Sequence, residues 1–187
     1  MGPEGSRLWD RFLGRSDTKV LLLGLDAAGK TTLLYRLNPD QTQSPTLRSF
    51  FIETLQYRNI SFVCWDASLN PRYLVLYRQF FTEAKAVIYM VDSLDRDRIA
   101  EARETLEWIL GPEELIGAVL LVLGNKQDLP GAMHYSELEE QLALKELRGR
   151  QWRLQLCSVI TLEGLAEGLD WLSSVLARRA SLVLPTQ

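Results

Sequence analysis

The chain has 187 residues, a net charge of −3 and an apolar content of 47%. This length is enough for one domain with a sizeable core, and the acidic balance argues against a nucleic-acid-binding surface. No apolar run is long enough to span a bilayer, and we find no pattern of a secretory signal.

Short apolar runs alternate with stretches of helical periodicity along the chain. In chain order, the pattern predicts a strand over 19–24, a helix over 31–37, and a hairpin of strands over 50–57 and 60–65. Further strands are expected at 86–91, 119–124 and 154–157, with helices over 99–109, 136–144 and 165–176 between and after them. Such alternation predicts an α/β fold with a mostly parallel sheet and helices on both faces.

The first predicted strand leads into Gly24-Leu25-Asp26-Ala27-Ala28-Gly29-Lys30-Thr31-Thr32, which contains the phosphate-binding pattern G-x-x-x-x-G-K-T. Gly24 and Gly29 let the backbone curl so that its N–H groups point at phosphate oxygens. Lys30 supplies a cation for the terminal phosphates, and the Thr31 hydroxyl can ligate Mg²⁺. Because a strand precedes this loop and a helix follows it, we expect a nucleotide here. The alternative is a chance glycine turn between two core elements.

The second motif, Asn125-Lys126-Gln127-Asp128, follows the strand over 119–124 and suits guanine. The Asp128 carboxylate can accept both the N1–H and the exocyclic amine of guanine, whereas adenine offers neither donor there. The Lys126 stem can lie along the base, and Asn125 can brace the phosphate loop. After the strand over 154–157, backbone N–H groups of Ser158-Val159-Ile160-Thr161 could hold the guanine carbonyl, or the segment could be a simple strand-to-helix connection.

With Asn59-Ile60-Ser61-Phe62, Trp65-Asp66 and Glu167-Gly168-Leu169-Asp170-Trp171-Leu172, these motifs resemble the ADP-ribosylation-factor (Arf and Arf-like) family of small GTPases. The resemblance implies a Ras-like P-loop GTPase fold over 17–180, with a six-stranded sheet that has one antiparallel strand. An amphipathic helix over 1–16 would precede this domain, and a tail over 181–187 would follow it. The implied function is a monomeric switch that binds GTP or GDP with Mg²⁺. Its implied partners are effector proteins, an exchange factor and a GTPase-activating protein.

Switch II departs from the family pattern W-D-x-G-G-Q, because the chain has Trp65-Asp66-Ala67-Ser68-Leu69-Asn70. By resemblance, Asp66 supports the metal through water. Leu69 replaces the glycine whose N–H contacts the γ-phosphate, and leucine resists the backbone angles that glycine accepts. Asn70 replaces the glutamine that orients the attacking water and is one methylene shorter. A displacement of ~1 Å can cost about a hundredfold in rate, so we expect slow hydrolysis.

Switch I is altered as well. Pro45-Thr46 resembles the family's P-T, whose threonine ligates Mg²⁺ in the GTP form. One extra residue stands before Phe50, so Thr46 is either the metal ligand or out of register. Phe50, Trp65 and Phe80 match the family's hydrophobic triad for effectors, although each could equally belong to the core.

The N-terminal segment has features of a membrane anchor. Leu8, Trp9, Phe12 and Leu13 share one side of a helix over 5–14, which suits an anionic lipid interface or packing on the domain itself. Gly2 fits the pattern for N-myristoylation, although the rigid Pro3 opposes it. The resemblance therefore implies a cytoplasmic protein bound peripherally to an intracellular membrane.

Two other functions remain open at this point. The altered switch II favours a non-hydrolysing pseudo-GTPase that serves as an interaction module. An ATP-dependent P-loop kinase is the third possibility, but it needs an arginine-rich lid and an acceptor site that we do not find. Cys64 and Cys157 both fall in predicted buried strands, which is typical of core packing in a reducing compartment.

Overall fold

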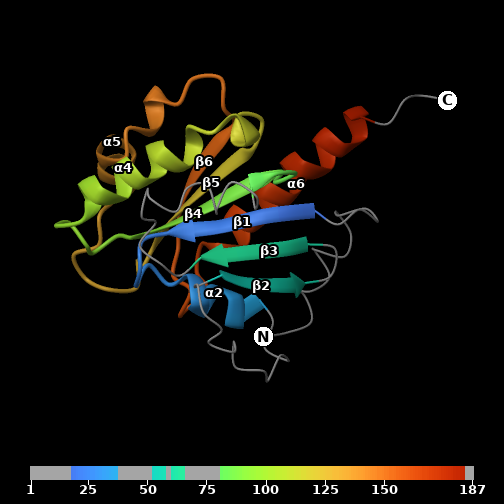
Figure 1. Ribbon diagram of the computed structural model, residues 1–187. Coiled ribbons are helices and arrows are strands. Elements are labelled where there is room, and N and C mark those ends of the chain that lie inside the picture. Colours follow the sequence, from blue (N-terminus) through green and yellow to red (C-terminus); the bar gives the residue numbers. More distant parts are fainter. Residues whose placement is uncertain (1–17, 38–51, 58–59, 66–80, 184–187) are drawn as a thin grey trace.

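The computed structural model describes residues 18–37, 52–57, 60–65 and 81–183 (Figure 1). These residues contain a six-stranded sheet with the order β2-β3-β1-β4-β5-β6. β2 runs antiparallel to β3, and every other neighbouring pair is parallel. The strands are β1 (Thr18–Gly24), β2 (Ile52–Tyr57), β3 (Ile60–Trp65), β4 (Ala86–Asp92), β5 (Val119–Asn125) and β6 (Trp152–Leu156).

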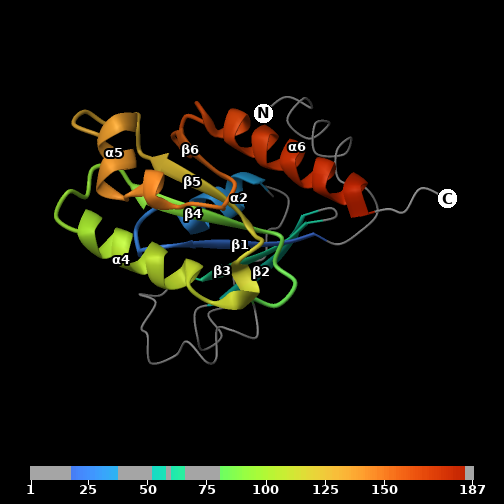
Figure 2. The same ribbon diagram turned by 90° about the horizontal axis from the view of Figure 1, so that it is seen from above.

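Helices cover both faces of this sheet. Figure 2 shows α4 and α6 on opposite sides of the strands. The helices are α2 (Lys30–Leu37), α4 (Ile99–Leu110), α5 (Tyr135–Gln141) and α6 (Leu165–Val183), with the short 3-10 helices η2 (Glu113–Leu115) and η3 (Leu144–Glu146). The predicted α/β fold, with a mostly parallel sheet and one antiparallel strand, is confirmed.

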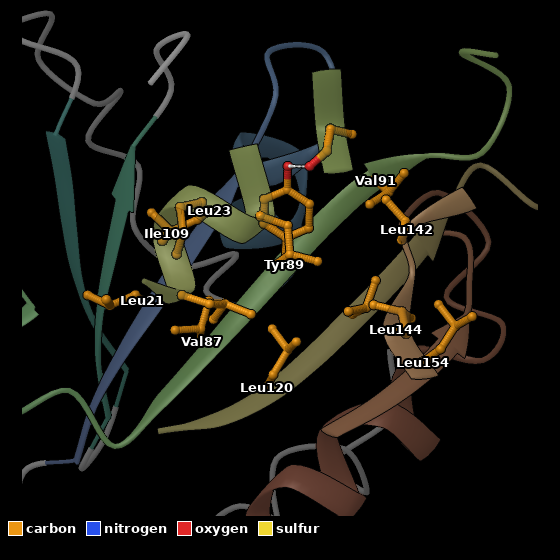
Figure 3. Close-up of a cluster of buried hydrophobic side chains, with 14 of the residues drawn as sticks. Leu21, Leu23, Val87, Tyr89, Val91, Ile109, Leu120, Leu142, Leu144 and Leu154 are labelled. Atoms are coloured by element: carbon orange, nitrogen blue, oxygen red, sulfur yellow. Dashed lines mark hydrogen bonds between the residues drawn. The ribbon is translucent and has the colours of Figure 1, made fainter. Parts of the chain in front are cut away.

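The core has two layers because successive strand residues point to opposite faces. In β4, Val87 and Tyr89 pack with α4 and α5, whereas Ile88 and Met90 pack with α2 and α6. Figure 3 shows the first of these layers, in which strand side chains meet Ile109 and Leu142. A strand buried on both faces carries a continuous apolar run, which explains why β1, β4 and β5 were recognisable from the sequence.

Some element ends differ from those predicted. The helix expected over 136–144 ends at Gln141, and Ala143 then takes a left-handed conformation (φ 50°) before η3. The strand expected over 154–157 begins two residues earlier and ends at Leu156. The last helix continues to Val183, seven residues beyond its predicted end at 176. The buried Cys157 is a free thiol, and burial raises its pKa to about 12, so it is an inert part of the core.

Tyr89 has a polar group deep in the core. Its side chain is fully buried, and its hydroxyl donates a 2.7 Å hydrogen bond to the carbonyl of Ala102 in α4 (Figure 3). Burial raises the pKa of this hydroxyl well above its usual value, so it stays protonated and remains a donor. The bond therefore ties the central strand to the helix that covers it.

We expect Tyr89→Phe to lower the free energy of unfolding by about 1–2 kcal/mol, because the carbonyl of Ala102 loses a buried donor. Urea denaturation of the full chain measures this change. The matched control is Tyr135→Phe, because Tyr135 is exposed at the start of α5 and should change stability by less than about 0.5 kcal/mol. Equal effects of the two variants would contradict a structural role for the buried hydroxyl.

Candidate functional site

The phosphate loop lies between β1 and α2, at the carboxyl edge of the sheet. Three of its residues, Gly24 (φ 143°), Ala27 (φ 59°) and Gly29 (φ 104°), have positive φ. A Cβ at Gly24 would overlap the carbonyl oxygen of Met90, and one at Gly29 would overlap the side-chain nitrogen of Asn125. Both positions therefore require glycine, and the curled backbone forms the concave surface that binds anions in proteins.

Lys30 is held inside this loop. Its side chain is 1% exposed, and its ammonium donates to the carbonyls of Gly24 (3.0 Å) and Leu25 (2.7 Å). The residue also begins α2, whose N-terminus adds a positive field, and the half-buried Thr31 and Thr32 follow in its first turn. A buried cation, a curled loop and a helix N-terminus together fit a polyphosphate.

Asn125 connects this loop to a second part of the chain. Its side-chain N–H donates to the carbonyl of Ala28 (2.8 Å), and its side-chain oxygen accepts from the N–H of Val159 (3.0 Å). The residue is 1% exposed, so both bonds lie out of water. Asn125 therefore contacts the phosphate loop and also joins it to the loop after β6.

Lys126 and Asp128 lie in the turn that follows Asn125. Lys126 has a left-handed backbone (φ 69°), and its ammonium forms a 2.5 Å ion pair with Asp92 at the end of β4. The backbone N–H of Gln127 donates to the carbonyl of Cys157 (3.2 Å), which fixes the turn against the end of β6. Asp128 is exposed, so its carboxylate is accessible to a base.

The loop after β6 uses its own N–H groups within the protein. Those of Ile160 and Thr161 donate to the Ser158 hydroxyl (3.2 and 3.1 Å), and that of Val159 donates to Asn125. The N–H of Ser158 donates to the carbonyl of Glu163 (3.0 Å). A guanine carbonyl would have to share or replace one of these bonds, and those to the Ser158 hydroxyl are the longest.

Several of the expected site residues lie outside the described residues. These are Gly2 and the N-terminal helix, Thr46, Phe50, Asp66, Leu69, Asn70 and Phe80. Trp65 is the last residue of β3, but its side chain is not described. The structure therefore brings together the phosphate loop, the guanine motif and the loop after β6. Thr46 of switch I and residues 66–70 of switch II lie outside the described residues.

Two residues at this edge were not expected from the sequence. Asp92 pairs with Lys126, and Arg98, just before α4, forms a 2.7 Å ion pair with Asp26 of the phosphate loop. Asp92 stands at the carboxyl end of a predicted strand, where ligands of parallel sheets bind, so its position in the sequence could have indicated a site residue. Arg98 lies six residues after β4, and no sequence pattern around it indicated a contact with the phosphate loop.

Comparison with protein families agrees with this geometry. The model of the ADP-ribosylation factor family matches residues 6–176. The match includes the phosphate loop, the guanine motif and the loop after β6, and it extends over residues that the structure does not describe.

Proposed function

The chain belongs to the ADP-ribosylation factor family and is therefore a small GTPase of the GTP-binding switch type, and we propose that it recruits effector proteins at a membrane surface when GTP is bound. The observation that best supports this proposal is the pair of bonds made by Asn125. They join the loop suited to phosphates to the two loops suited to the base.

We assign the phosphates to Lys30 and the backbone of residues 24–32, and the base to Asn125, Lys126 and Asp128. Mg²⁺ would bind the Thr31 hydroxyl, with Thr46 as a second ligand and Asp66 acting through water. Mg²⁺ would neutralise phosphate charge, which is the usual role of this ion beside a phosphate loop. Leu69 would contribute a backbone N–H to the γ-phosphate. In the loop that contains Ser158 and Val159, a guanine carbonyl would accept from an N–H that now donates within the protein.

The proposal includes attachment to a membrane and binding of partner proteins. The apolar side of the N-terminal helix, with or without an acyl chain on Gly2, would bind an intracellular membrane from the cytoplasm. Phe50, Trp65 and Phe80 would anchor effectors, and an exchange factor and a GTPase-activating protein would set the nucleotide state of a monomeric chain. Within the described part of the chain, no helix combines the length and apolar composition that crossing a bilayer requires.

The direct test is to identify the nucleotide that copurifies with the full chain and then to compare pull-downs with GDP and with a non-hydrolysable GTP analogue. We expect a guanine nucleotide and partners that are recovered only with the analogue. Equal recovery with both nucleotides would contradict the switch and favour a constitutive interaction module. Displacement by ATP would instead favour a P-loop kinase.

Intrinsic hydrolysis should be slow because Asn70 is too short to hold the attacking water in place. We expect Asn70→Gln to raise the single-turnover rate of GTP hydrolysis by about tenfold. The GDP affinity of the same variant is the internal control, since switch II should not affect it. An unchanged rate would show that Asn70 does not take the place of the family glutamine.

A further inference from the structure

Arg98 links the start of α4 to the phosphate loop. Its guanidinium lies 2.7 Å from the Asp26 carboxylate, although the two residues are 72 positions apart in the chain. The two also line a small cavity between the loop and the helix, together with Leu25, Ala28 and Ile99. The ion pair therefore connects the phosphate loop to the start of a helix that packs on the core.

The guanidinium is oriented by α4 as well as by Asp26. Its Nε donates to Glu101 (2.8 Å), and the backbone N–H of Arg98 donates to Asp95 (3.2 Å). Since α4 is anchored in the core by its buried face, these bonds fix the cation on a rigid support. The side chains of Arg98 and Asp26 are 32% and 56% exposed, so water and salt screen the pair.

The position of Asp26 means that this pairing can affect phosphate binding. The residue stands between Gly24 and Lys30 in the loop that receives the phosphates, where an uncompensated carboxylate would repel them. The Arg98 hydrogen bond is the main cause that lowers the pKa of Asp26 below its usual value. Asp95 and Glu101 also lie beside the guanidinium, so three carboxylates share one cation.

We infer that Arg98 is a positioning residue for the nucleotide, which holds the Asp26 carboxylate and offsets part of its charge so that the phosphate loop accepts a triphosphate. This inference rests on the proposed guanine-nucleotide site. Without Arg98, the negative charge of Asp26 acts on the phosphate chain. GTP carries one more phosphate than GDP and therefore more negative charge. Its binding should depend more on the ion pair between Arg98 and Asp26.

The test is a double-mutant cycle of Arg98→Gln and Asp26→Asn in the full chain, with fluorescent GDP and a non-hydrolysable GTP analogue titrated in Mg²⁺. We expect Arg98→Gln to weaken the GTP analogue about fivefold and GDP less than about twofold, with smaller effects at high salt. Adding Asp26→Asn should restore both affinities to within about twofold of wild type, because the unpaired carboxylate is gone.

The matched control is Arg103→Gln, which removes an arginine within α4 that pairs with a carboxylate, Glu107, at 2.8 Å. It should leave both affinities unchanged. Arg98→Lys should keep most of the affinity for the GTP analogue, since it keeps the charge. If Arg98→Gln does not fold, Asp26→Asn alone decides the question, because the inference requires it to bind the GTP analogue at least as tightly as wild type.

Three results would overturn the inference. They are unchanged GTP binding in Arg98→Gln, an equal loss for both nucleotides, and no rescue by Asp26→Asn. An equal loss without rescue would mean that Arg98 only supports the shape of the loop. If wild type and Arg103→Gln bind neither nucleotide, the proposed function fails too, which distinguishes that failure from a failure of the inference alone.

Discussion

Replacing Asn125 by alanine should weaken guanine-nucleotide binding by about a hundredfold and lower the free energy of unfolding by about 2–4 kcal/mol. The substitution removes both side-chain bonds of this buried residue, so the carbonyl of Ala28 and the N–H of Val159 lose their partners out of water. The phosphate loop and the loop after β6 would then no longer be held together before the nucleotide arrives. Equilibrium titration with labelled GDP and urea denaturation measure the two effects.

Asn125→Asp separates the two bonds. It keeps an acceptor for Val159 but places a carboxylate oxygen beside the carbonyl of Ala28, so nucleotide binding should still be weak. Gln155→Ala is the control, because it removes an amide whose hydrogen bonds lie within β6 and should leave binding unchanged. Normal binding by Asn125→Ala would show that the nucleotide site does not depend on this connection.

The strands and helices of this fold could be predicted because their apolar patterns are strong and local. β1, β4 and β5 are buried on both faces, so each has an apolar run that the sequence shows directly. The end of α5 could not be predicted, since Leu142 and Leu144 continue the helical spacing and only the left-handed Ala143 breaks it. A positive φ at alanine depends on packing around the turn and leaves no mark in the sequence.

The site was predictable where it consists of contiguous motifs and not where it depends on tertiary contacts. The spacing of Gly24, Gly29 and Lys30 is typical of a phosphate-binding loop. In the structure, a Cβ would overlap other atoms at either glycine, and the Lys30 ammonium donates to a carbonyl of the loop. Arg98 stands in a charged stretch, Asp95-Arg96-Asp97-Arg98, in which either arginine could have faced solvent. Only the path of β4 and the start of α4 place one of them against Asp26.

The choice of base should depend on Asp128. We expect Asp128→Asn to weaken GTP binding by about a hundredfold, because an amide has one acceptor oxygen where guanine presents two donors. Xanthosine triphosphate has a carbonyl in place of the guanine amine, so it should bind the variant better than GTP does. Stability should change by less than about 0.5 kcal/mol, since Asp128 is exposed.

Competition of labelled GDP by GTP, xanthosine triphosphate and ATP measures this preference in the wild type and the variant. Glu140→Gln is the matched control, because it makes the same charge change at an exposed position of α5 and should keep the preference for GTP. If Asp128→Asn still prefers GTP, the carboxylate does not read the base. The turn fixed by Lys126 and Gln127 would then have only a structural role, and specificity would have to come from the loop after β6, where the bonds to the Ser158 hydroxyl are the easiest to exchange.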